Sequence, residues 1–373
     1  MKESDRSMPQ SSATPFSAEA MEILAHLMLS PDAEMGVAWT RENLGTLSDE
    51  NRQVLLELAH SNHVVIRGLE RYRQLMLLAG DSAQASWAET QIATEHKRIG
   101  HALEFLDAAF KAFDATGLDV TVIKSLDHWP DFGSDIDLYT NAPSETVIEL
   151  MKSRFNATVA DRSWGDRMAG KWNFDIPGLP EAVEIHIGRL GQTGEQLVLA
   201  SQLPARSRPA EFAGHSLRVA SASDRIMIST LQRMYRHFYF RLCDIADSAA
   251  LVNSGAVDFD DLRRAATAAG IWEGVATYLV LVSDYSRQYT RKNLPLPAFV
   301  REAARFGGEV IYFGKSFLRV PIFPQSAVLY GTQLTDLIRT RKLQSSARLA
   351  VLPWLATAAA IGHKITGSDK GIW

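Results

Sequence analysis

The chain has very little cysteine: Cys243 is the only one among its 373 residues. One cysteine excludes a disulfide within the chain, and cysteine alone cannot build a zinc site. Disulfides are typical of oxidising compartments, so their exclusion fits a reducing one. We therefore expect a cytoplasmic protein.

An excess of charge of either sign is also missing, since 39 Lys and Arg stand against 43 Asp and Glu, a formal net charge of -4. This balance gives no overall attraction to nucleic acid or to anionic membranes. A polynucleotide partner would need a local basic patch, and we expect none. The hydrophobic content of 46% is ordinary for a globular protein, and the length suits two or three modest domains.

Long hydrophobic runs are scarce. The apolar run from Leu349 to Gly362 is shorter than the ~20 residues that a membrane span needs, and Pro353 interrupts it. We expect no transmembrane segment, and we expect this run to pack on the body of the protein, on a second copy or on a partner. Residues 1–15 are rich in Ser, Gln and Pro and lack the apolar core of a signal peptide, which predicts a disordered tail.

Two predicted strands lie within residues 120–140. Residues 120–123 form a β-branched run, which is typical of a buried strand. After a polar turn, apolar Ile136 and Leu138 alternate with Asp135 and Asp137. A strand with this alternation points both carboxylates to one face and both aliphatic side chains into the core.

Two neighbouring carboxylates repel each other unless a cation or a proton lies between them, and Mg²⁺ is the usual cation. The pair therefore predicts a metal site. The alternative is an edge strand with ordinary solvated surface acids.

These residues resemble a known motif. Lys124-Ser125, a short turn, and then Gly133-Ser134 directly before Asp135 to Leu138 are similar to the motif of the DNA-polymerase-β-like nucleotidyltransferase superfamily. The closest resemblance is to a group of uncharacterised bacterial nucleotidyltransferase family proteins, and it covers residues 50–290. The sequence departs from that group at Ser125, where glycine is usual. The resemblance implies an α+β fold with a polymerase-β-like core that carries a small mixed sheet.

A third carboxylate is expected on a separate strand. Residues 183–187 alternate so that Glu184 and His186 share one face. Transfer of a phosphoryl group by two metal ions needs a third acid beside the first two. The resemblance supports Glu184, because the group carries an acidic residue, any residue and then His at this place.

The resemblance then implies a division of roles. Asp135, Asp137 and Glu184 would be the catalytic acids that hold Mg²⁺ or Mn²⁺, with Glu184 helping to deprotonate the nucleophile. Lys124, together with Ser125 or Ser134 beside Gly133, would bind the phosphates of the nucleotide. His186 would either orient a ligand directly or donate a hydrogen bond to a residue that binds it.

The implied reaction moves a nucleoside monophosphate, most plausibly AMP from ATP, to a hydroxyl or phosphate of a small-molecule or peptide acceptor and releases pyrophosphate. One alternative is a nucleotide- or partner-binding protein that keeps the fold without catalysis, which the Lys-Ser departure permits. Another is a glycosyltransferase, since those enzymes also use Asp-x-Asp. Against the latter, no βαβ series precedes Asp135.

The chain divides into a helical region over 16–117, the core over 118–220, a helical domain over 221–294 and an extension over 295–373. In the first region, the spacing of apolar residues predicts a long helix from Ser86 to Ala115, and Gly80 predicts the end of the helix before it. Its histidines, which are His60, His63, His96 and His101, are expected at the surface or in helix caps. A helix is predicted from Ser223, as its N-cap, towards Val252. Arg233, Arg236, His237, Arg241 and Asp244 would form a polar stripe on it, used either for surface ion pairs or for contact with the cleft.

Overall fold

The computed structural model describes residues 16–31, 37–45, 47–191, 195–352 and 354. The tail expected over residues 1–15 and most of the apolar run from Leu349 to Gly362 lie outside the described residues. The packing of that run, on the protein or on a partner, therefore stays a prediction.

A mixed sheet of seven strands, in the order β3-β4-β5-β2-β1-β7-β6, forms the centre of the fold. Its strands are β1 (Thr121–Val122), β2 (Ile136–Thr140), β3 (Thr158–Val159), β4 (Lys171–Asp175), β5 (Val183–Ile187), β6 (Arg208–Phe212) and β7 (His215–Val219). The pairs β2 with β5 and β1 with β7 are parallel, and the other neighbours are antiparallel. The predicted α+β class with a mixed sheet is confirmed. The sheet is larger than expected because the β6–β7 hairpin extends it beyond β1.

Strand β2 shows the predicted alternation. Ile136 and Leu138 are fully buried in the main hydrophobic core. Tyr139, on the same face as Asp137, is buried as well, in a smaller apolar cluster with Ile123 and Ala220. The face of β2 that carries Asp137 is therefore polar near its start, whereas near its end Tyr139 is covered by apolar side chains.

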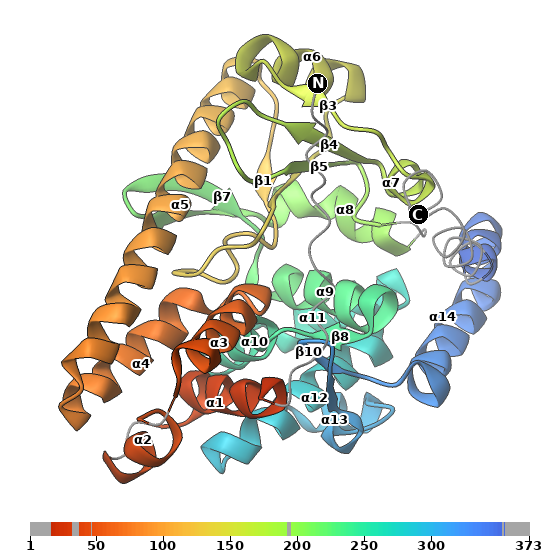
Figure 1. Ribbon diagram of the computed structural model, residues 1–373. Helices are drawn as coiled ribbons and strands as arrows, with labels where there is room; N and C mark the ends of the chain where they lie inside the picture. The colour runs from red at the N-terminus through yellow and green to blue at the C-terminus, as the bar shows by residue number, and fades with distance from the viewer. Residues whose placement is uncertain (1–15, 32–36, 46, 192–194, 353, 355–373) are drawn as a thin grey trace.

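Five helices precede the sheet: α1 (Ser17–Leu29), α2 (Val37–Asn43), α3 (Asp49–Ser61), α4 (Val65–Ala79) and α5 (Ser82–Ala115). Helix α4 ends at Gly80, whose φ of 82° is the left-handed conformation that glycine adopts easily, so the predicted stop is confirmed. Helix α5 begins four residues before the predicted Ser86, because the Asp81 side chain accepts a hydrogen bond from the Gln84 N–H and caps it. This helix runs along one side of the sheet (Figure 1).

Three helices are inserted between the strands of the sheet: α6 (Ser144–Phe155), α7 (Trp164–Ala169) and α8 (Glu195–Arg206). Behind the sheet follow α9 (Ala222–Gln232), α10 (Leu242–Asn253), α11 (Phe259–Ala269) and α12 (Trp272–Thr290).

The single helix predicted from Ser223 to Val252 is wrong. Helix α9 is capped by Ser221, whose side chain accepts from the Asp224 N–H. A π-helical turn over Arg233–His237 follows, and Phe238 then adopts a left-handed φ of 56°. That conformation ends a right-handed helix, so the chain passes through a short strand, β8 (Tyr239–Phe240), before α10 begins.

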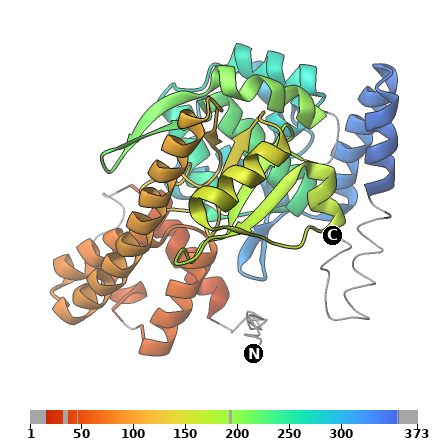
Figure 2. The same ribbon diagram turned by 90° about the horizontal axis from the view of Figure 1, so that it is seen from above.

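The C-terminal part is joined to the helices before it. Strands β9 (Tyr312–Gly314) and β10 (Phe317–Arg319) form a second sheet in which β10 pairs with β8. The helices of this part are α13 (Ala298–Ala303), α14 (Ala327–Arg339) and a segment over residues 343–352. The N-terminal helices and α14 lie on opposite sides of the sheet in both ribbon views (Figures 1 and 2). Among the described residues, none of the helices combines the length and apolarity needed to cross a membrane.

Candidate active site

All but one of the predicted site residues meet in a pocket of about 240 Å³, and the exception is His186, which is buried and does not line it. One wall is formed by the turn between β1 and β2 and by the strands of the sheet, and the opposite wall is formed by the segment between α9 and α10. Of the predicted site residues, seven line this pocket: Lys124, Ser125, Gly133, Ser134, Asp135, Asp137 and Glu184.

The strand register brings the acids together. Asp137 on β2 pairs directly with Glu184 on the parallel strand β5, and His186 follows two residues later on the same face. Ligand atoms of Asp137, Glu184 and His186 all lie within 4.8 Å of one another. Asp135 lies one residue before β2 and lines the same pocket, but it is not part of this three-residue group.

Two lysine side chains neutralise two of the acids. Lys124 Nζ lies 2.5 Å from Asp137 Oδ1, and Lys171 Nζ lies 2.8 Å from Glu184 Oε1. Lys171 also reaches Asp166, at 3.2 Å. Asp135 has no such partner among the described residues. The carboxylates therefore have unequal surroundings, although they share one pocket.

The pKa values follow this difference. Burial alone would raise the pKa of Asp137, but Lys124 and His186 outweigh it and hold the pKa well below its usual range. For Asp135, burial and the negative charges of Glu184 and Asp137 raise the pKa to about 6. Burial and the charge of Lys124 lower the pKa of His186, which favours its neutral form. Asp135 is thus the acid that would gain most from a cation.

The two candidate serines have different surroundings. Ser125 is buried, its hydroxyl donates to the Asp135 carbonyl at 3.0 Å, and it accepts from the Asp137 N–H at 2.8 Å. Ser134 is exposed, and its hydroxyl lies 3.3 Å from the Asp135 carboxylate. Ser125 therefore fixes the backbone of the Asp-x-Asp segment, and Ser134 is the one available to a ligand.

Backbone constraints explain the turn between β1 and β2. A Cβ on Gly133 would meet the Asp135 carbonyl oxygen at 3.3 Å, tighter than ordinary contact. From helix α5, Arg98 donates to the Gly133 carbonyl at 3.2 Å and to Glu181 at 2.7 Å. Lys124 adopts a left-handed φ of 63°, which is uncommon for a residue with a side chain. The turn is held from several sides, which fixes where Lys124 and Asp135 point.

The opposite wall of the pocket is basic. It is formed by Arg233, Arg236, His237 and Arg241, four of the five residues of the predicted polar stripe. The fifth, Asp244, forms an ion pair with Arg233 at 2.7 Å. Burial and the charge of Arg236 lower the pKa of His237, which favours the neutral imidazole. The stripe contributes both an internal ion pair and contact with the pocket, although the helix expected to carry it is interrupted.

Sequence reasoning missed Lys171 and Arg98. Lys171 begins β4 and lies opposite His186 in the antiparallel pair, so only the strand register identifies it as a neighbour of the acids. Arg98 follows Glu95 by three residues on α5, which in sequence indicates a helix-surface ion pair. Neither has a local signal that points to the pocket.

Comparison with known proteins returns no match, either to a family model or to a curated protein. The functional inference therefore depends on the motif and on the geometry of the pocket.

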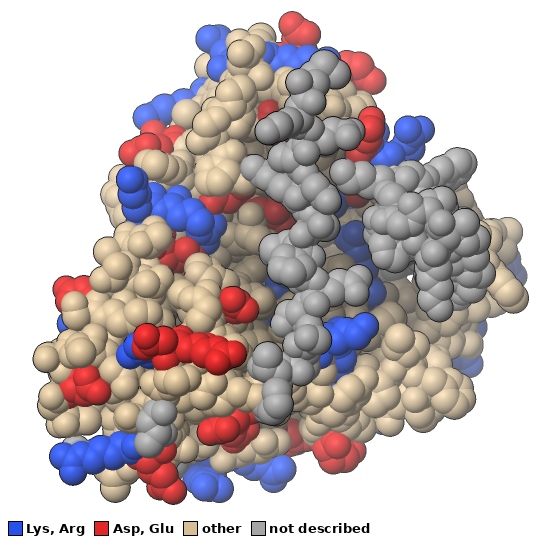
Figure 3. Space-filling model, in the orientation of Figure 1, with Lys and Arg blue, Asp and Glu red and all other residues tan. Residues whose placement is uncertain are grey.

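On the face drawn in Figure 3, acidic and basic side chains are interspersed across the part that the described residues form.

Proposed function

We propose that this protein is a metal-dependent nucleotidyltransferase with a polymerase-β-like core, which transfers AMP from ATP to a hydroxyl or phosphate of a small-molecule or peptide acceptor. A bond forms between the acceptor oxygen and the α-phosphorus, the bond to the pyrophosphate oxygen breaks, and the acceptor loses a proton. The observation that carries the proposal is the parallel pairing of Asp137 with Glu184, with Asp135 beside them in the same pocket.

The donor set suits Mg²⁺ or Mn²⁺. Both ions prefer carboxylate oxygens, and a cation beside Asp135 would offset the burial and the negative charges of Glu184 and Asp137 that raise its pKa. Asp135, Asp137 and Glu184 would hold the ions, which would stabilise charge on the phosphates and on the attacking oxygen. Binding would displace Lys124 from Asp137 and Lys171 from Glu184. The Lys124 ammonium would then be available to a phosphate, while Lys171 keeps its contact with Asp166.

The charge distribution of the pocket supports a polyanionic ligand. A triphosphate placed between the acids and the basic wall would contact Arg236 and Arg241 on one side and Lys124 and Ser134 on the other. Arg233 is already paired with Asp244 and is less available. A volume of about 240 Å³ is below the roughly 300 to 1,000 Å³ of typical ligand pockets, so part of a nucleotide would extend outside it.

One observation favours a second candidate, a nucleotide- or anion-binding protein without catalysis. Two of the three acids already have lysine partners, and an arrangement in which Lys124 and Lys171 stay in place would leave a cationic pocket without a metal site. Such a protein would bind the nucleotide equally well with and without divalent ions.

The test is transfer of label from each α-labelled NTP, with Mg²⁺ or Mn²⁺, into a cell extract supplied with the purified protein. The proposal predicts label in a small molecule or a peptide, abolished by Asp137→Asn and retained by Asp175→Asn, which changes an exposed acid at the end of β4. Nucleotide binding without any labelled product, whichever ion is supplied, would favour the second candidate.

A further inference from the structure

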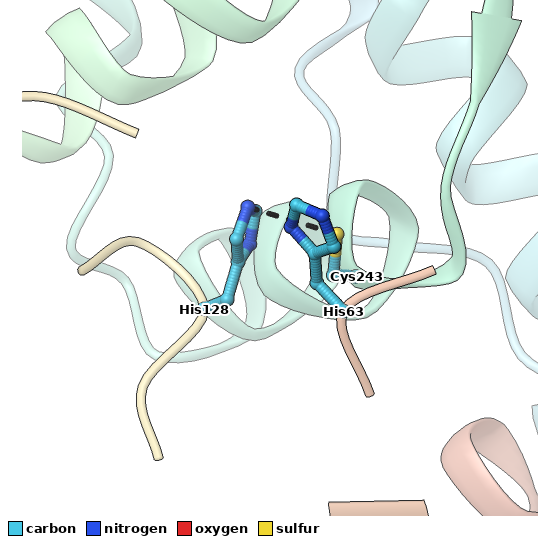
Figure 4. Close-up of side chains that lie close together, drawn as sticks. All are labelled: His63, His128 and Cys243. Atoms are coloured by element: carbon cyan, nitrogen blue, oxygen red, sulfur yellow. Dashed lines mark hydrogen bonds between the residues drawn. The ribbon is translucent and has the colours of Figure 1, made fainter. Parts of the chain in front are cut away.

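Three metal-binding side chains meet in the wall of the pocket, away from the acids. His63 follows α3, His128 lies in the turn between β1 and β2, and Cys243 is the second residue of α10. The three side chains point towards one another from these separate segments (Figure 4). Each is buried, and Cys243 is fully so. His63 and His128 also line the pocket.

The spacing of the three ligand atoms is close to that of a metal site. One ligand atom from each residue lies within 4.8 Å of the other two, and the Cys243 Sγ lies 3.7 Å from His128 Nε2. Around a tetrahedral zinc ion, with Zn–N near 2.0 Å and Zn–S near 2.3 Å, a nitrogen and a sulfur lie about 3.5 Å apart. One pair is therefore already close to the required separation, and the His63 nitrogen, which lies within 4.8 Å of both other ligand atoms, needs to move by at most ~1.5 Å.

The His63 ring packs edge-on against the His128 ring, with centroids 5.4 Å apart, but one of its nitrogens is unpaired. Its Nδ1 is buried without a hydrogen-bond partner among the described residues, and only 7% of the residue is exposed. Burial of an unpaired ring nitrogen costs free energy. A metal ion at this place would satisfy it.

The backbone holds His63 in an unusual conformation. Helix α3 ends with the His63 N–H donating to the His60 carbonyl and the Val64 N–H donating to the Ala59 carbonyl, an arrangement in which glycine is usual. His63 adopts a φ of 53° there. The Asn62 carbonyl accepts from the Cys243 N–H at 3.3 Å, which ties this turn to α10 and places His63 beside Cys243.

His128 has the support that metal-binding histidines normally have. Its Nδ1 lies 2.6 Å from Asp247 Oδ2, so a proton on Nδ1 leaves the Nε2 lone pair facing Cys243. A carboxylate on the far nitrogen fixes the ring and strengthens it as a ligand. Asp247 is itself held by Arg67 at 2.6 Å.

The charges near the cluster are compatible with a cation. Burial and then the charge of Arg241 lower the pKa of His63, which favours its neutral ring. For His128, Cys243 and Asp247 outweigh burial and raise the pKa, so a metal ion would have to displace a proton from that ring. Arg233 is paired with Asp244, and Asp247 and a Cys243 thiolate would supply negative charge. A Cys-His-Asp nucleophile built from the same residues is disfavoured, because Cys243 is fully buried and is not among the residues that line the pocket.

We propose that His63, His128 and Cys243 bind a zinc-type transition-metal ion in the wall of the pocket. The mixed imidazole and thiolate set selects a borderline or soft ion over Mg²⁺. Such an ion would tie the N-terminal helices, the turn that carries Lys124, and α10 to one another. This site differs from the carboxylate site in its residues and in the ion it selects.

The test is titration of the reduced, full-length protein with Co²⁺ after removal of metals by a chelator. Cobalt in a tetrahedral site gives strong visible bands, and coordination by a thiolate adds a sulfur-to-cobalt charge-transfer band. Because Cys243 is the only cysteine, that band reports this site alone. We expect one equivalent of Co²⁺ to produce the band, Zn²⁺ to displace it and Mg²⁺ to leave it unchanged.

Variants assign the ligands. Cys243→Ser should abolish the charge-transfer band. His63→Gly, which suits the left-handed backbone and keeps the turn, should weaken Co²⁺ binding at least about tenfold, as should His128→Gln. His101→Gln, at an exposed position on α5, and Asp137→Asn, in the carboxylate site, should both retain the band.

Either of two results would overturn the proposal. One is a wild-type protein that shows no thiolate band at saturating Co²⁺ while it remains folded by circular dichroism. The other is a band that keeps its affinity in both His63→Gly and His128→Gln, since cobalt would then be bound by Cys243 without the histidines.

Discussion

The ammonium of Lys124 lies 2.5 Å from the Asp137 carboxylate and 3.4 Å from His186 Nε2, so this one side chain contacts both an acid and the imidazole of the site. The ammonium of Lys171 likewise lies 2.8 Å from the Glu184 carboxylate. Within the described residues, Asp137 and Glu184 are thus balanced by internal cations and Asp135 is not, and a divalent ion would compete with both lysines.

Lys124→Ala should separate two effects. Loss of a charge-assisted phosphate contact, worth about 1.5 to 3 kcal/mol, should weaken NTP binding about tenfold or more. Mg²⁺ alone should bind more tightly, because the Asp137 carboxylate loses its internal cation. Calorimetric titrations with Mg²⁺, with NTP and with the unphosphorylated nucleoside measure the three affinities.

The matched control is Lys152→Ala, which removes an exposed lysine from the last turn of α6 and should change none of these affinities. Equal losses for NTP and nucleoside in Lys124→Ala would show that Lys124 has a structural role instead.

The raised pKa of Asp135 predicts that the stability of the protein depends on pH in the absence of divalent ions. This pKa of about 6 lies above the ordinary 3.8, so the folded protein binds this proton more tightly than the unfolded chain does. The free energy of unfolding should therefore fall as the pH rises from about 4 to about 6. Asp135→Asn should be more stable than wild type above pH ~6, by on the order of 1 to 3 kcal/mol, and equal to it below pH ~4.

Urea denaturation in a chelating buffer at several pH values checks this expectation. Asp175→Asn, at an exposed position, should follow the wild-type curve. A variant no more stable than wild type at neutral pH would mean that Asp135 is not destabilised by its neighbours.

The two serines should respond differently to alanine. Ser125→Ala removes both hydrogen bonds that hold the Asp-x-Asp backbone and leaves the buried Asp137 N–H without its acceptor, at a cost of about 1 to 3 kcal/mol of stability. Ser134→Ala should leave stability unchanged and weaken NTP binding. Urea unfolding and nucleotide titration of both variants make the comparison, and the reverse pattern would contradict the roles assigned here.

Much of the core could be predicted from local sequence. Alternation over residues 135–139 and 183–187 identified both strands and the face on which Asp137, Glu184 and His186 lie, because side-chain direction in a strand repeats every two residues. Glycine at position 80 gave a helix end, since its left-handed conformation has no steric cost.

The rest depends on contacts between distant segments. Lys171 faces the acids only through the β4–β5 register, and His63, His128 and Cys243 meet only when three segments pack together. The break after His237 was missed because the apolar spacing continues through it, whereas the backbone turns at Phe238. Periodicity reports the faces of one element, and it carries no information on which elements become neighbours.

Binding of an NTP in the presence and absence of Mg²⁺, measured by calorimetry, tests the central claim most directly because it needs no knowledge of the acceptor. We predict that wild-type protein binds the NTP far more tightly with Mg²⁺, that Asp137→Asn and Glu184→Gln lose this difference while remaining folded, and that Asp175→Asn keeps it. NTP affinity that is the same with and without the divalent ion, or unchanged in both site variants, would contradict the assignment of these acids to a metal-dependent nucleotidyltransferase.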